Sequence, residues 1–193
     1  MPDTSVSLLD RLRSQPDSAS WQRLVELYAP LIRGWLRREG LQQSDADDLA
    51  QDVLAVLVHE LPAFQRQRPG AFRAWLRTIT VNRLRNFWRT RQGRPAALGG
   101  SDFGQRLEQL EDPHSELSRL WDREHDEQVV RRAMELIEGE FAPSTWRAFR
   151  RVMVDGASVD AVAAGLGLSA NAVFIAKSRV LNRLRKEIEG LVD

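Results

Sequence analysis

The stretch TVNRLRNFWRT, residues 80–90, mixes arginines with aromatic side chains and asparagines. At about 100° per residue, one helix face collects the polar side chains Thr78, Asn82, Arg85 and Arg89, with Asn86 beside them. Amides can read base edges and arginines can hold phosphates, while Trp75 and Trp88 near the margins can stack on bases. This composition is typical of a surface for single-stranded or melted DNA. The alternative is an ordinary solvated face with the tryptophans in a core.

The charge distribution along the chain favours the nucleic-acid interpretation. The net charge of the 193 residues is only +1, but residues 61–101 hold nine arginines and no acid. The flanking blocks, 1–60 and 102–193, are each net acidic. A basic block repels itself unless an anion neutralises it, and the flat arginine fork suits phosphates and base edges. Nucleic acid is therefore the leading partner.

A second set of polar residues lies upstream in QQSDADDLAQDVLAVLVHEL, residues 42–61. Ser44 is expected to cap a helix that begins at Asp45, with Asp47 as its capping-box partner. Two alternatives remain for Gln51 and Asp52 together with the neighbouring acids: a metal or acid–base site, or an acidic surface that docks a basic protein. The three histidines, His59, His114 and His125, form no HExxH or other close ligand pairing. Docking is favoured, also because this helix is apolar nearly all round.

A third pattern lies at the C-terminus in DGASVDAVAAGLGLSANAVFIAKSRVLNRLRKEI, residues 155–188. A short helix over 158–164, a turn over 165–167 and a second helix capped by Ser169 outline a helix-turn-helix. The second helix directs polar side chains outward: Asn171, Lys177, Ser178, Arg179 and Asn182. The alternative is an ordinary helical hairpin. The two glycines of the turn are not a phosphate loop, because no strand precedes them and no P-loop lysine follows.

These surfaces need helices to position them, and apolar spacing near 3.6 residues runs through almost the whole chain. We predict an all-α fold with two small helical domains, residues 1–93 and 129–193, joined by an acidic flexible linker over 94–128. There is no cysteine, so disulfides and thiolate zinc sites are excluded. The apolar runs are too short to span a bilayer, so no membrane insertion and a cytoplasmic location are expected. No cofactor and no enzymatic activity are expected.

The chain resembles the extracytoplasmic-function (ECF) group of sigma-70-type RNA polymerase sigma factors. The resemblance rests on LVELYAPLIRGWLRREG, DADDLAQDVL and PAFQRQRPGAFRAWLRTITVNRLRNFWR, followed by FAPSTWRAFRRVMVDGASVDAVAAGLGLSANAVFIAKSRVLNRLRKEI. It implies that the first domain binds core polymerase and captures the melted minus-ten strand. It also implies that the second domain reads the minus-thirty-five element as duplex.

The resemblance also implies roles for particular residues. Asp48, Gln51 and Asp52 would dock on core polymerase, and the segment 64–72 would hold a flipped base. The minus-ten contacts would be Phe64, Phe72, Trp75, Thr78, Asn82, Arg85, Asn86, Trp88 and Arg89. The minus-thirty-five contacts would be Ser169, Asn171, Phe174, Lys177, Ser178, Arg179 and Asn182. An anti-sigma protein is a further implied partner.

Two positions depart from the family pattern. The family often carries arginines where this chain has Phe174 and Ala176, so Phe174 would contact either a thymine methyl group or another protein. Val56 and Val58 are more aliphatic than expected in the docking helix. The alternative functions are a helix-turn-helix regulator that binds duplex DNA without polymerase, a nucleic-acid-processing enzyme that uses the aspartates, and an interaction protein that binds through its acidic linker.

Overall fold

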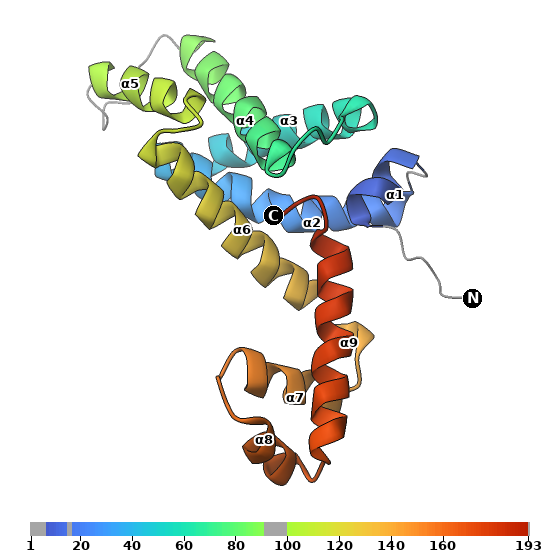
Figure 1. Cartoon of the computed structure of the whole chain (residues 1–193). Helices are drawn as coiled ribbons and strands as arrows, with labels where there is room; N and C mark the ends of the chain where they lie inside the picture. Colours follow the sequence, from blue (N-terminus) through green and yellow to red (C-terminus); the bar gives the residue numbers. More distant parts are fainter. Residues whose placement is uncertain (1–6, 15–16, 91–99, 193) are drawn as a thin grey trace. The chain divides into compact units, whose positions relative to one another are not determined.

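A computed structural model describes residues 7–14, 17–90 and 100–192. Within these ranges the regular structure is helical, with one isolated bridge between Glu189 and Val192, so the predicted all-α fold is confirmed. The described residues fall into two compact units. The N-terminal unit comprises residues 7–129 and 189–192, and the C-terminal unit comprises residues 130–188. Figure 1 follows the chain from α1 to α9.

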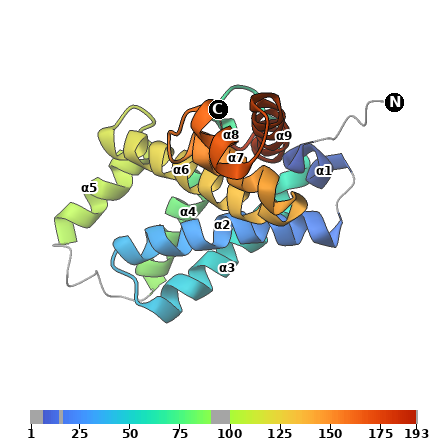
Figure 2. The same ribbon diagram turned by 90° about the horizontal axis from the view of Figure 1, so that it is seen from below.

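Three long helices form the centre of the N-terminal unit: α2 (Ser18–Arg38), α3 (Gln43–Glu60) and α4 (Ala71–Thr90). The short α1 (Leu8–Ser14) packs against α2 and the 3-10 turn η1 (Leu61–Ala63). Helix α3 packs between α2 and α4, and Figure 2 shows it alongside α2. Asp17 begins α2 by accepting a hydrogen bond from the Ser20 backbone N–H at 2.8 Å. The core they enclose contains fully buried side chains, including Leu24, Tyr28, Ile32, Leu57 and Leu76.

The start of α3 differs from the expected capping box. The helix begins at Gln43, its cap position is Gln42, and no side chain makes a capping hydrogen bond there. Ser44 therefore lies inside the first turn. The prediction of Ser44 as cap was wrong, because the extended backbone that a cap needs falls two residues earlier, at Gln42 (ψ 161°).

Much of the stretch expected to be a flexible linker is helical. Helix α5 covers Gly100–Glu111 and α6 covers Glu116–Ile137. The first residues of this stretch, 94–99, lie outside the described residues. Leu107, Leu110 and Trp121 are buried, and the N-terminal unit extends to Val129, within α6. Apolar side chains at helical spacing within an acidic composition explain this difference, since charge alone does not prevent one face from packing.

The C-terminal unit contains the end of α6, the 3-10 turn η2 (Glu138–Glu140), α7 (Pro143–Met153), α8 (Val159–Leu166) and α9 (Ala170–Ile188). Its core brings together Ala148, Val162, Ala163, Val173 and Ala176. Helix α8 extends two residues beyond the expected end at residue 164. The turn is therefore centred on Gly167, whose positive φ of 64° closes the helix in the left-handed conformation.

No single helix in the described ranges is both long enough and apolar enough to cross a membrane; α8 and α9 reach these criteria only as a pair bent by 106°.

Candidate nucleic-acid interface

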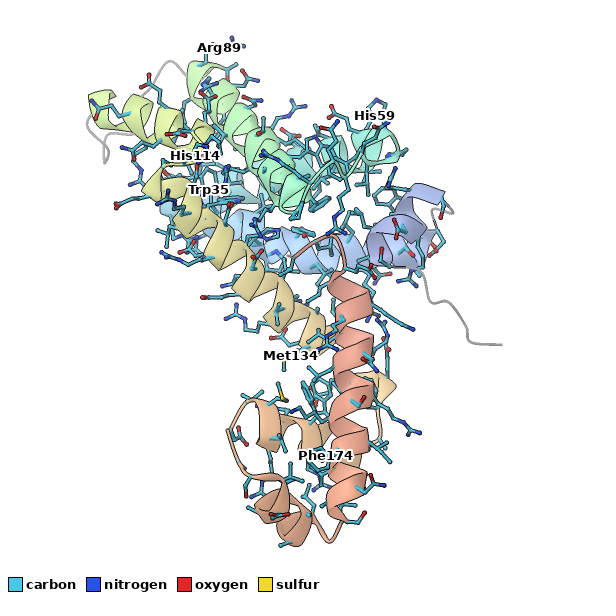
Figure 3. All side chains as sticks on the ribbon, in the orientation of Figure 1. Trp35, His59, Arg89, His114, Met134 and Phe174 are labelled. Atoms are coloured by element: carbon cyan, nitrogen blue, oxygen red, sulfur yellow. The ribbon has the colours of Figure 1, made fainter. Side chains whose placement is uncertain are left out.

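The polar face predicted for α4 is exposed in the structure. Thr78, Asn82, Asn86 and Arg89 are all exposed, and Arg85 is partly exposed. The Thr78 hydroxyl donates to the Ala74 carbonyl at 3.0 Å, which leaves the two asparagine amides as the hydrogen-bonding groups at the centre of the face. Figure 3 shows Arg89 at the C-terminal end of α4.

The opposite face of α4 holds the helix in this orientation. Leu76, Thr80 and Leu84 are fully buried, and the Thr80 hydroxyl donates to the Leu76 carbonyl at 2.8 Å. Phe87 is only half-buried and meets Trp88 edge to face, with ring centroids 5.0 Å apart. The buried stripe sets the rotation of α4, so the asparagines cannot turn into the core without exposing it.

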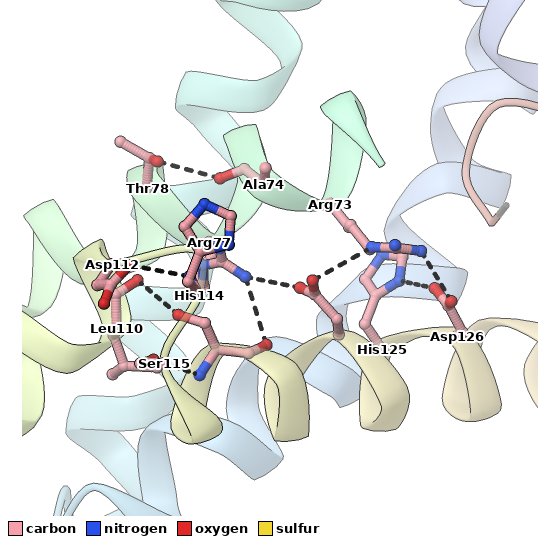
Figure 4. Close-up of polar contacts among 12 residues, drawn as sticks. Arg73, Ala74, Arg77, Thr78, Leu110, Asp112, His114, Ser115, His125 and Asp126 are labelled. Atoms are coloured by element: carbon pink, nitrogen blue, oxygen red, sulfur yellow. Dashed lines mark hydrogen bonds and ion pairs between the residues drawn. The ribbon is translucent and has the colours of Figure 1, made fainter. Parts of the chain in front are cut away.

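Two arginines of the acid-free block are held by acids from α6 (Figure 4). Arg77 is buried, and its guanidinium lies 2.6 Å from the Asp122 carboxylate. Arg73 pairs with Asp126 at 2.8 Å and with Asp122 at 3.5 Å. Burial lowers the pKa of the Arg77 guanidinium, and Asp122 opposes this by favouring the charged form. These two arginines stabilise the N-terminal unit internally and do not belong to an open basic surface.

A buried histidine extends the same cluster toward α2. His125 Nδ1 lies 2.9 Å from the Asp126 carboxylate, and its Nε2 lies 3.3 Å from the Tyr28 hydroxyl. Burial raises the pKa of Tyr28 well above its usual value, and the Asp126 charge raises it further. Close by on α6, Trp121 meets Trp35 edge to face at 4.8 Å. The first half of α6 is thus bonded to both α2 and α4.

Helix α5 also contributes charged partners to the N-terminal unit. Arg106 donates two hydrogen bonds, at 2.9 and 3.2 Å, to the buried carboxylate of Glu39 at the end of α2. That contact raises the pKa of Arg106. Glu111 pairs with Arg85 at 2.5 Å, and both side chains are more than one-third exposed. Such a pair contributes about 0–1 kcal/mol, so Arg85 can exchange Glu111 for a phosphate at little cost.

The aromatic residues around the 64–72 segment form one cluster. Phe64 and Trp75 stack at 4.7 Å with an interplanar angle of 22°, and both are half-buried. Phe72 is only 1% exposed and packs against Tyr28, Phe64 and Trp75. The expectation that Phe72 contacts DNA is therefore corrected: its ring belongs to the core. The buried position follows from its place one turn before Leu76 on the inner face of α4.

The acidic face predicted for α3 is also exposed. Asp48, Gln51 and Asp52 are exposed and have no ion-pair partner among the described residues. Asp47, by contrast, is paired with Arg33 of α2 at 2.9 Å. A groove of about 370 Å³ borders Asp52, and its lining includes Val56 and His59 from α3 and Arg83 from α4. The acidic face of α3 and the polar face of α4 are thus carried by two helices that pack against each other.

The aspartates of α3 belong to no metal-binding cluster among the described residues. In the described part of the chain no group of three or more His, Asp or Glu side chains is arranged to hold a metal ion. Val53, Leu54 and Leu57 are buried, while Val58 remains 40% exposed. Helix α3 therefore carries an exposed apolar side chain, Val58, as well as its exposed acids.

Helices α8 and α9 of the C-terminal unit have the dimensions of a helix-turn-helix. A three-residue turn joins them, and their axes bend by 106°. Ser169 accepts a hydrogen bond from the Ala172 backbone N–H at 3.1 Å and so begins α9, as predicted. The exposed side chains of α9 include Asn171, Phe174, Ser178, Arg179 and Asn182, and Lys177 is half-buried.

One basic residue of α9 is committed to the fold. Arg183 binds Glu140 through two nitrogens, at 2.6 and 2.8 Å, and binds the buried Glu187 at 2.7 Å. Burial opposes its charge, but hydrogen bonds to Glu140 and Glu187 leave the pKa of Arg183 raised overall. The basic surface of α9 therefore rests on Lys177, Arg179 and the exposed Arg185.

The Arg73, Arg77, Asp122 and Asp126 cluster was not predicted from the sequence. A signal was nonetheless present, because both the two arginines and the two aspartates are spaced four residues apart. Matching i, i+4 spacings place each pair on one helix face and allow the two faces to meet. The arginine pair and the aspartate pair lie about fifty residues apart in the sequence, so spacing within one helix does not relate them.

The comparisons with known proteins agree with this geometry. Residues 24–94, which include all of α3 and α4, match the family Sigma-70 region 2. The chain is 27% identical to the RNA polymerase sigma factor CnrH of Cupriavidus metallidurans, over 100% of this chain and 96% of that protein. It is 33% identical to the RNA polymerase sigma factor NccH of Alcaligenes xylosoxydans xylosoxydans, over 53% of this chain and 55% of that protein.

A third relative carries the ECF designation in its name. The chain is 32% identical to the ECF RNA polymerase sigma factor RpoE of Cereibacter sphaeroides, over 40% of this chain and 42% of that protein. The family match covers both exposed faces of the N-terminal unit, and the alignment with CnrH covers the complete chain. Residues 24–94 therefore match Sigma-70 region 2, and the chain as a whole is similar to RNA polymerase sigma factors, one of which carries the ECF designation.

Proposed function

We propose that this chain is an RNA polymerase sigma factor of the ECF group, which binds core RNA polymerase, directs it to specific promoters and stabilises the melted minus-ten strand. The observation that carries the proposal is the pairing of two exposed faces on packed helices: Asp48, Gln51 and Asp52 on α3, and the asparagine-bearing face on α4. One face suits a basic protein and the other suits a nucleic-acid strand. A sigma factor needs both at once.

The α3 face is assigned to core polymerase. Its two carboxylates are solvent-exposed and have no ion-pair partner among the described residues. A basic protein can therefore form ion pairs with them without breaking an internal bond. Val58, on the same helix, adds an exposed apolar side chain. Charge complementarity of this kind mainly accelerates association and fixes the orientation of the partner.

The α4 face is assigned to the melted minus-ten strand. Asn82 and Asn86 offer donors and acceptors to unpaired bases, and Arg89 and Arg85 offer charge to phosphates. Phe64 and Trp75, half-buried and already stacked on each other, provide an aromatic edge for a flipped base. Opening costs about 1.4 kcal/mol per stacked step, so capture of bases after they open stabilises the bubble without ATP.

The C-terminal unit is assigned to the minus-thirty-five duplex. In a helix-turn-helix the N-terminal part of the second helix enters the major groove. In α9 this part carries Asn171, Phe174 and Ser178, all exposed. The two units thus correspond to two promoter elements: the N-terminal unit captures the melted strand and the C-terminal unit reads the duplex.

Further properties belong to this proposal. The factor acts in the cytoplasm, inserts into no membrane, needs no cofactor and has no enzymatic activity of its own, as expected for a subunit that redirects a polymerase. An anti-sigma protein is the proposed regulator. The competing function is a helix-turn-helix regulator that binds duplex DNA without polymerase.

The test is transcription from a genomic fragment library by purified core polymerase, with and without this protein, followed by sequencing of the RNA starts. We expect starts that depend on the protein and share two upstream elements at a fixed spacing. Tight duplex binding by the protein alone, with no new starts, would favour the regulator and contradict the proposal.

Two variants separate the assigned faces. Asp52→Arg should weaken core binding, whereas Asn82→Ala should leave core binding intact and reduce permanganate-detected opening by about tenfold, the scale of one lost base contact. Glu108→Arg reverses another exposed acid, on α5, and serves as the charge control. Normal opening by Asn82→Ala at normal core occupancy would remove Asn82 from the strand-reading role.

A further inference from the structure

The recognition helix of the C-terminal unit exposes two neighbouring apolar side chains. Phe174 is 55% exposed and Ile175 is 45% exposed, in the second turn of α9. Figure 3 labels Phe174 on α9. Single exposed apolar residues are common on protein surfaces. Two adjacent ones on a helix assigned to DNA indicate that a binding partner covers them.

The register of α9 leaves these residues no place in the core. Val173, Ala176, Val180 and Leu184 are buried at helical spacing and set the inward face. Val173 and Ala176 enclose the Phe174–Ile175 pair in sequence and belong to the core cluster shared with α8. Rotation of α9 to bury Phe174 would therefore expose that cluster, so the outward direction of the pair is enforced by packing.

The side chains around Phe174 are a mixture of apolar, polar and basic groups. Phe174 forms one wall of a shallow hollow of about 220 Å³, which is also lined by Lys177, Ser178, Leu181, Asn182 and Arg185. From Ala170 to Lys186 the helix contains no acid. An occupant of this surface must therefore combine negative charge with a small apolar group.

The major groove of DNA meets this requirement at thymine. Phosphates line the groove, and the thymine C5-methyl group is the apolar feature on its floor, where phenylalanine is an established contact type. We propose that Phe174, supported by Ile175, reads thymine methyl groups in the minus-thirty-five element. This inference rests on the proposed function of the C-terminal unit and specifies which base it selects.

The test removes only the methyl group. In a promoter identified by the library experiment, each thymine of the upstream element is replaced in turn by deoxyuridine, and the affinity of the holoenzyme is measured by competition. At one or two positions we expect about fourfold weaker binding, the effect of one buried methyl group. Deoxyuridine keeps every hydrogen-bonding group of thymine, so the loss reports the methyl contact alone.

A double-variant cycle identifies the side chain. Phe174→Ala should weaken binding to the thymine promoter by a similar factor and should show little further loss with deoxyuridine at the same position. Phe174→Leu should retain part of the response. The matched control is Met153→Ala, which removes another exposed apolar side chain, on α7, and should leave the thymine preference unchanged.

Two results would overturn the proposal. One is that no deoxyuridine replacement changes holoenzyme affinity; if Phe174→Ala then weakens core binding, the pair contacts protein. The other is an unchanged deoxyuridine response in Phe174→Ala. If the library yields no protein-dependent starts, the proposed function fails separately. The same replacements are then made in duplexes selected from random DNA by the chain alone, and absence of any thymine preference there rejects the proposal.

Discussion

The Arg77 guanidinium lies inside the N-terminal unit, 2.6 Å from Asp122 and 3.4 Å from the Ser118 carbonyl. A buried charge of this kind depends on its partner, because water cannot replace the lost bond. Its neighbour Arg73 is held by Asp126 as well as Asp122, so the two arginines differ in how much they depend on a single acid.

The first prediction concerns this ion pair. Asp122→Ala should lower the free energy of unfolding by about 3–5 kcal/mol, because Arg77 remains charged and buried. The double variant Arg77→Met/Asp122→Leu should recover much of the loss. Thermal and urea unfolding followed by circular dichroism measure both, with Glu127→Ala, an exposed acid of the same helix, as control. If the Asp122→Ala variant and the natural protein have the same free energy of unfolding, the result would contradict the structural role of the pair.

The second prediction concerns the cap of α2. Hydrogen bonds from the Ser20 backbone and side chain hold the pKa of Asp17 below its usual 3.8. The stabilisation is therefore present above the unfolded-state pKa and is lost as pH falls through the folded-state pKa. Asp17→Ala should lower the melting temperature at pH 7, and the difference should shrink below about pH 4.

The matched variant for this cap is Asp17→Asn, which retains an acceptor that does not titrate. Its melting temperature at pH 7 should lie nearer the natural protein than that of Asp17→Ala. A difference between the natural protein and Asp17→Ala that stays constant from pH 7 to pH 3 would show that the carboxylate is not responsible.

At the scale of elements, the α8–α9 pair depends on its turn. Gly167 has φ of 64°, a conformation that costs a side-chain-bearing residue more than glycine. Gly167 follows the last residue of α8, and its N–H bonds back to Ala163, so the turn both closes α8 and directs the chain into Ser169. The direction in which α9 leaves α8 follows from these few residues.

The third prediction is that Gly167→Ala destabilises the C-terminal unit by about 1 kcal/mol or more. Gly34→Ala is the matched control with the opposite sign. Gly34 lies inside α2, has no neighbouring atom within 4 Å of an added methyl group, and should gain up to about 1 kcal/mol as alanine. Chemical unfolding of each variant measures the difference. A neutral Gly167→Ala would mean that the turn adapts without strain.

At the scale of the whole molecule, the net charge of +1 conceals internal neutralisation. The acid-free block supplies Arg73, Arg77 and Arg85, and acids from α5 and α6 bind all three within the N-terminal unit. The exposed basic surface is thus smaller than the number of arginines suggests, and under the proposed function specificity would depend more on Asn82 and Asn86. This arrangement limits sequence-independent binding to phosphates.

The fourth prediction follows from the place of α6 in this unit. The amides of residues 118–128 should exchange hydrogen slowly, at rates like those expected for α4, because Trp121 and His125 are buried and the helix is hydrogen-bonded. Mass spectrometry of the intact chain measures this exchange, and the non-helical residues 64–68 provide the fast internal reference. If residues 118–128 exchange as fast as residues 64–68, the result would contradict a packed α6 and support the flexible linker expected from composition.

The sequence by itself determined what depends on neighbours along the chain. Helical periodicity placed the exposed asparagines of α4, the exposed acids of α3 and the cap at Ser169, because each follows from spacing within one helix. Two of the positions that it left wrong, the start of α3 and the end of α8, lie at helix ends. A change of one or two residues there alters few bonds.

Only the tertiary structure determined the environment of side chains whose partners lie far away in sequence. It placed Phe72 in the core, bound Arg77 to Asp122, bound Arg183 to Glu140 and packed Trp121 against Trp35. In each case the side chain could serve either a surface or an interior. The choice is made by burial and charge compensation between helices, which no spacing within one helix specifies.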